Sequence, residues 1–107
     1  MIFEWFSTTE IDALADRLAR DLARRVPPAS IGASDKKAES QQGKSREALL
    51  RQVREFSGKH RLNIFKKARL ANRFKWALLD AGYPKEFVDA MAFELAAVMA
   101  ATRKNPA

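Results

Sequence analysis

Lysine and arginine side chains carry the clearest chemistry in this sequence. Residues 46–77 hold ten of them against two acids, a net charge of +8, in a chain of 107 residues whose overall charge is +7. The excess positive charge therefore lies in one segment. A concentrated positive field attracts phosphate groups or anionic headgroups whatever the fold beneath it. The segment predicts a polyanionic partner and does not identify which one.

On a helix, several of these cations would share one face. At about 100° per residue, Lys59, Lys66, Arg69 and Arg73 fall on a single arc. Arginine binds phosphate through two parallel hydrogen bonds, and lysine acts as a point charge. The face opposite this arc is predicted to pack in the core; it consists of Ile64, Phe65, Ala68, Ala71, Leu78 and Leu79. With two flanking residues added, the predicted nucleic-acid-binding set is Lys59, Arg61, Lys66, Lys67, Arg69 and Arg73.

Three alternatives for this basic segment remain open at the sequence level. It could be a solvated helix face that keeps the protein soluble, a dock for an acidic protein, or the second helix of a helix-turn-helix around Ser57-Gly58. We favour nucleic-acid binding because few acids relieve the like charges at helical spacing. DNA and RNA are not distinguished. Phe74 and Trp76 could stack on bases, but we expect both in the core.

Catalysis and metal binding receive little support. The chain has no cysteine and one histidine, which excludes thiolate chemistry and disulfides and disfavours transition-metal sites. Asp12 and Asp16 lie one helical turn apart, with Arg17 and Arg20 as their expected partners. We therefore expect no catalytic residue, no metal and no cofactor.

The apolar pattern predicts an all-α protein, a small bundle of about four helices. The first helix is expected to begin at Ser7, where Ser7 and Glu10 match a capping box, and to stop at Pro27-Pro28. A second is expected from Ser45 to about Phe56 and a third from Leu62 to Ala81. A fourth should run from about Pro84 to Thr102 and be the most buried of the four. Gly82 and Pro84 mark the corner between the last two helices.

These elements divide the chain into an N-terminal helical arm (1–26), a flexible Ser/Gly/Pro/Gln-rich linker (27–45), a basic helical core (46–102) and a frayed tail (103–107). On the arm, Ile11, Ala15, Leu18 and Leu22 have the 4-3-4 spacing of a short coiled-coil seam. That seam could form a homodimer through helix one. We favour packing of the arm on its own chain.

The N-terminal apolar residues and the overall hydropathy bear on location. Phe3, Trp5 and Phe6 are expected to pin the N-terminus to the domain rather than enter a membrane surface, because Glu4 lies among them. No stretch is long and apolar enough to span a bilayer, so the expected location is cytoplasmic. The expected function is a non-catalytic nucleic-acid-binding protein. The alternative is a helical protein–protein interaction or oligomerisation module with no nucleic-acid role.

Overall fold

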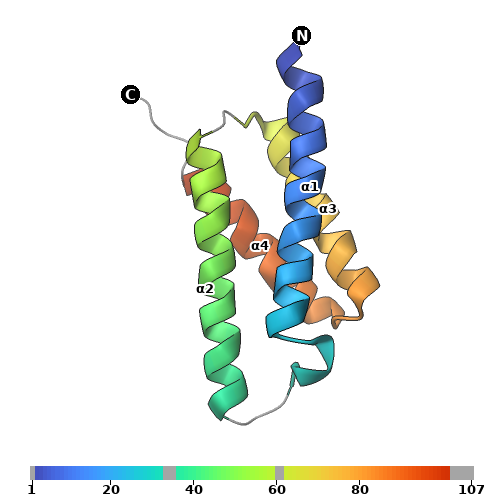
Figure 1. Cartoon of the computed structure of the whole chain (residues 1–107), viewed down its shortest axis with the longest axis vertical. Coiled ribbons are helices and arrows are strands. Elements are labelled where there is room, and N and C mark those ends of the chain that lie inside the picture. The colour runs from blue at the N-terminus through green and yellow to red at the C-terminus, as the bar shows by residue number, and fades with distance from the viewer. Residues whose placement is uncertain (1, 33–35, 60–61, 102–107) are drawn as a thin grey trace.

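The computed structural model contains four α-helices: α1 (Ile2–Arg25), α2 (Lys36–Lys59), α3 (Ile64–Ala81) and α4 (Lys85–Ala101) (Figure 1). The description covers residues 2–32, 36–59 and 62–101, without the side chains of residues 2–8 and 38. The expected all-α bundle is therefore confirmed. His60, Arg61, the tail from residue 102 and the packing of Phe3, Trp5 and Phe6 lie outside the described part.

Helix α1 begins at Ile2, so the predicted start at Ser7 is wrong. Nothing between Ile2 and Phe6 breaks a helix, and Ser7 is accommodated inside it. The predicted stop is confirmed: α1 ends at Arg25, and Pro28 opens a short 3₁₀ turn, Pro28–Ser30. The apolar stripe of α1 is buried against the rest of the chain and comprises Ile11, Leu14, Ala15, Leu18, Ala19 and Leu22.

Helix α2 begins at Lys36, nine residues before the predicted cap at Ser45, so the helix takes in the second half of the expected linker. The residues from Lys36 to Ser45 include lysine, alanine, glutamate and glutamine, which favour helix, and no proline follows Pro28 before Pro84. Only Gly43 weakens the run. Because glutamine is a good helix former, these residues extend α2 where a linker was predicted.

Both ends of α3 have clear caps. Asn63 accepts a hydrogen bond from the Lys66 backbone N–H at 2.8 Å, and Gly82 closes the helix with φ of 104°. Glycine adopts this left-handed conformation readily, and the predicted corner at Gly82 lies where the helix ends. Tyr83 then turns inward, and its hydroxyl donates to the Val26 carbonyl. This bond ties the α3–α4 corner to the end of α1.

The helices enclose one core. α1 packs against α3 and α2, and α4 crosses behind to contact α3 and α2 (Figure 1). α4 buries Val88, Met91, Leu95 and Met99 on one side only. The prediction that α4 is the most buried helix is wrong, because α1 contributes more buried apolar side chains. The coiled-coil seam of α1 is used within its own chain.

Candidate interaction surface

Two of the predicted phosphate-binding arginines, both still partly exposed, pair with acids of α1. Arg69 makes a two-pronged contact with Asp12: Nε to Oδ1 and Nη2 to Oδ2 are each 2.9 Å. One turn on, Arg73 reaches Asp16 with contacts of 3.3 and 3.4 Å, and its Nη1 lies 3.8 Å from Asp12 Oδ2. The hydrogen bond from Arg69 holds the pKa of the Asp12 carboxyl below its ordinary value. The hydrogen bond to Asp12 raises the pKa of the Arg69 guanidinium, and the hydrogen bond to Asp16 raises that of Arg73.

These pairs correct one expectation. Asp12 and Asp16 were expected to pair with Arg17 and Arg20 on their own helix, but their partners come from α3, 57 residues away in each hydrogen bond. Two further basic residues of residues 46–77 also pair outside that segment. Arg46 lies 3.6 Å from Glu94, and Lys75 lies 3.9 Å from Asp89, both on α4. Much of the local positive excess is therefore balanced by acids of α1 and α4.

The remaining predicted site residues do not form one face with the two arginines. Lys59 is exposed at the end of α2, a different helix, and Lys67 is half-buried. Lys66 is buried, with 8% of its surface exposed, and Arg61 lies outside the described residues. The buried stripe of α3 consists of Lys66, Leu70, Phe74 and Leu78. Because this stripe is rotated from the predicted one, residues assigned to the core face solvent.

The exposed side of α3 is partly apolar. Ile64 is 84% exposed and Phe65 is 66% exposed, although both were predicted in the core, and Ala68 is exposed too. Of the two aromatics expected in the core, Phe74 is buried and Trp76 is 58% exposed. The prediction was thus correct for Phe74 and wrong for Trp76.

An open groove of about 410 Å³ lies beside Trp76, where α3 meets α1. Its lining residues are Asp16, Arg69, Asn72, Arg73, Trp76, Ala77 and Asp80. The two arginines are matched by two aspartates, so the groove carries no net charge. A polyanion gains little electrostatic attraction there, because each guanidinium already has a carboxylate partner.

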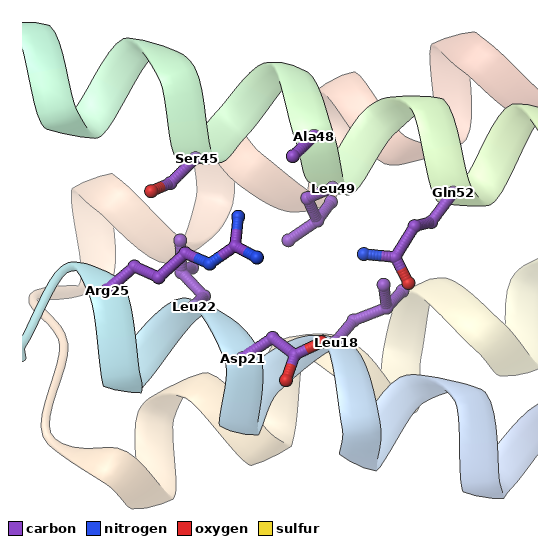
Figure 2. Close-up of a pocket in the computed structure, with 8 residues that line it drawn as sticks. All are labelled: Leu18, Asp21, Leu22, Arg25, Ser45, Ala48, Leu49 and Gln52. Carbon is purple, nitrogen blue, oxygen red and sulfur yellow. The ribbon is translucent and has the colours of Figure 1, made fainter.

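A second gap separates α1 from α2 (Figure 2). It holds only about 10 Å³, room for at most a single water. Its lining residues are Leu18, Asp21, Leu22, Arg25, Ser45, Ala48, Leu49 and Gln52. The buried Ser45 Oγ has no hydrogen-bond partner among the described residues, so one water would satisfy it. The gap is too small for a substrate or cofactor.

The second half of α4 presents an apolar face to solvent. Phe93 lies at the middle of the helix with 74% of its surface exposed. The other exposed residues on the second half of the helix are all alanines: Ala96, Ala97, Ala100 and Ala101. Glu94, the one ionisable residue between Ala90 and Ala101, lies toward α2 and pairs with Arg46. We call Ala90, Phe93, Ala96, Ala97 and Ala100 the α4 outer face.

Sequence reasoning missed Phe93 because it followed the buried stripe of α4 and did not ask what the opposite side carried. The signal was present: alanines and one phenylalanine occupy positions where a solvated helix normally has charged residues. Large apolar patches on the surface of a protein commonly mark sites of association.

Two classes of site find no candidate among the described residues. No group of three or more histidine, aspartate or glutamate side chains there is placed to hold a metal ion. None of the helices in the described ranges combines the length and hydrophobicity needed to cross a bilayer.

Comparisons with models of known protein families, with curated proteins and with solved structures find no match to this chain.

Proposed function

We propose that this protein is a non-catalytic helical interaction module that binds another protein chain through the α4 outer face. The observation that supports this most is Phe93, which is 74% exposed and is followed along its face by alanines without a charged residue. Keeping such a residue in water forgoes roughly 1.5–3 kcal/mol of burial free energy, which binding to a partner would recover. Ile64, Phe65 and Trp76 add exposed apolar area on α3.

This ordering differs from the sequence-based expectation, which put nucleic-acid binding first. Arg69 and Arg73 already have carboxylate partners, so a phosphate would have to displace those contacts. The α4 outer face needs no rearrangement before it can bind. A protein partner with an apolar surface is therefore favoured over a polyanion at the α3 site.

The proposal is tested with an affinity-tagged chain purified from cells that produce it naturally. Phe93→Glu places a charge in the middle of the α4 outer face, and Gln41→Glu places the same charge on an exposed part of α2 as the matched control. Phe93→Glu should lose a co-purifying protein that the wild type and Gln41→Glu retain. Equal recovery in all three would contradict the proposal. Both variants should unfold at the wild-type temperature, because both side chains are exposed.

Nucleic-acid binding is a second candidate, favoured by cations that have not been neutralised. Lys44, Arg51 and Arg54 are exposed on α2, and none forms an ion pair with another described residue; Lys59 follows at its end. Glu47 and Glu55 lie between them and reduce the local charge. Contact with three or four duplex phosphates predicts a log–log salt slope of about −3.

Fluorescence anisotropy with a labelled duplex and a labelled RNA across a salt series tests this candidate. Lys44→Glu with Arg51→Glu should abolish binding if α2 carries it. Arg69→Glu with Arg73→Glu should abolish binding if the site predicted from the sequence carries it. Absence of binding by the wild type at low salt would eliminate both.

A further inference from the structure

From the shape and charge of the α4 outer face, we infer that its partner is a second copy of this chain, packed antiparallel so that α4 lies against α4 about a two-fold axis. This inference rests on the proposed function and specifies the partner of the same face.

The face is complementary to itself in shape. It carries one large residue, Phe93, and small ones three to seven residues further along, at Ala96, Ala97 and Ala100. If two such helices cross at Ala96 and Ala97, where only methyl groups separate the backbones, Phe93 of each copy falls opposite Ala100 of the other. A two-fold interface requires such a match of one patch with itself.

The face is also suited to self-association in its charge. Two copies of a chain with a net charge of +7 repel one another, and this repulsion is smallest where the contacting surfaces lack cations. The part of α4 from Ala90 to Ala101 has no lysine or arginine, and Glu94 is directed to Arg46. In the antiparallel arrangement Glu86 and Asp89 lie beyond the Ala96–Ala97 crossing, away from the acids of the other copy. No like charges are opposed at the contact.

The area of the face sets the expected strength. A helix of 17 residues is about 25 Å long, and one face of it falls short of the roughly 800 Å² per partner of a stable interface. The dimer should therefore be weak and reversible. Dissociation in the range from tens of micromolar to about 1 mM corresponds to about −6 to −4 kcal/mol.

Sedimentation velocity on the full chain over a concentration series gives the first test. The wild type should shift from monomer toward dimer as concentration rises, and Phe93→Glu should stay monomeric over the same series. Gln41→Glu should behave as the wild type. A wild type that remains monomeric at about 1 mM would overturn the inference, as would a dimer that persists in Phe93→Glu.

Because the chain has no cysteine, a single introduced thiol reports the geometry. Ala97→Cys lies at the proposed crossing and should form a disulfide-linked dimer many-fold faster under a mild oxidant than Gln41→Cys on α2. Adding Phe93→Glu should remove that difference; equal rates for the two single variants would contradict the arrangement. A monomeric protein that still loses a different co-purifying chain with Phe93→Glu would overturn the homodimer and leave the proposed function standing.

Discussion

Asp12 contacts both arginines that the sequence predicted to bind phosphate. It accepts both hydrogen bonds from Arg69 and lies within 3.8 Å of Arg73 as well. Asp12, together with Asp16 one turn further along α1, therefore neutralises two guanidinium groups that would otherwise form an unpaired cationic pair. The arrangement joins two helices by charge as well as by apolar packing, and it removes the two arginines from the set available to a phosphate.

The Asp12–Arg69 contact should make stability depend on acid pH. The pKa of Asp12 is depressed in the folded chain, chiefly by the Arg69 hydrogen bond, so the contact stabilises the fold above the ordinary pKa of aspartate. That contribution is lost as pH falls through the depressed value. We expect Asp12→Asn to lower Tm by roughly 2–5 °C at neutral pH and by progressively less as the pH falls below the ordinary pKa of aspartate.

Thermal unfolding of wild type and Asp12→Asn over a pH series measures this difference. Asp89, whose pKa is also lowered, chiefly by its hydrogen bond from Lys85, is present in both proteins and cancels in the comparison. A difference in Tm that is constant with pH would show that the carboxylate charge has no part in it.

The ionisation of Tyr83 should make stability depend on alkaline pH. Burial raises its pKa to about 12 from the ordinary value of 10.0, because a charged phenolate is poorly solvated there. The neutral phenol therefore stabilises the fold fully below pH 10, and this contribution is lost as pH rises toward 12. The chain has one tyrosine, so ultraviolet absorbance of the phenolate follows Tyr83 alone. Its midpoint should lie near 12 in the folded chain and near 10 in denaturant.

Replacing Tyr83 by phenylalanine should cost about 1–2 kcal/mol in the free energy of unfolding, because the Val26 carbonyl loses its hydrogen-bond donor in a buried place. Urea unfolding measures this cost. A midpoint of phenolate formation near 10 in the folded wild type would contradict the buried position of the hydroxyl.

At the level of the helices, glycine has opposite effects at two positions. Gly82 ends α3 with φ of 104°, and an added Cβ would meet only Pro28 Cβ, at 3.9 Å. Gly43 lies within α2, and an added Cβ there meets nothing within 4 Å. We expect Gly82→Ala to cost about 1 kcal/mol through its backbone conformation alone. Gly43→Ala should stabilise the chain by about 0.5–1 kcal/mol.

Urea unfolding of the two variants measures both effects, and each serves as the control for the other. If Gly43→Ala proved neutral or destabilising, α2 would not be helical at Gly43. If Gly82→Ala proved neutral, the left-handed end of α3 would be wrong.

Helix existence and helix ends were predictable where local chemistry decides them. Pro27-Pro28 and Gly82 each act through their own backbone, so the stops of α1 and α3 follow from the residues themselves. The start of α2 at Lys36 has no such local marker: the residues from Lys36 to Ser45 favour helix, but the serines and Gly43 among them are also common in linkers. The side of α3 that faces inward was not predicted correctly: Lys66 and Leu70 are buried in the bundle, and no property of α3 alone specifies that.

At the scale of the whole molecule, long-range contacts also explain why the structure favours the α4 outer face over the basic site predicted from the sequence. Charge along the sequence is concentrated in residues 46–77, but the fold places acids of α1 and α4 against that segment. The net charge of a segment does not reveal an ion pair with a residue 57 positions away in the sequence. The surface that has no partner within the fold is apolar as well as cationic. On α4 its largest exposed apolar side chain is Phe93, at the centre of the α4 outer face.

The most direct test of the α4 outer face as an interaction surface is site-specific photo-crosslinking in the cells that produce the protein. A benzophenone side chain replaces Phe93 in one variant and Gln41, exposed on α2, in the other. We predict a discrete crosslinked product of defined mass from position 93 and none from position 41. Absence of a product at position 93, or the same products from both positions, would contradict the central claim.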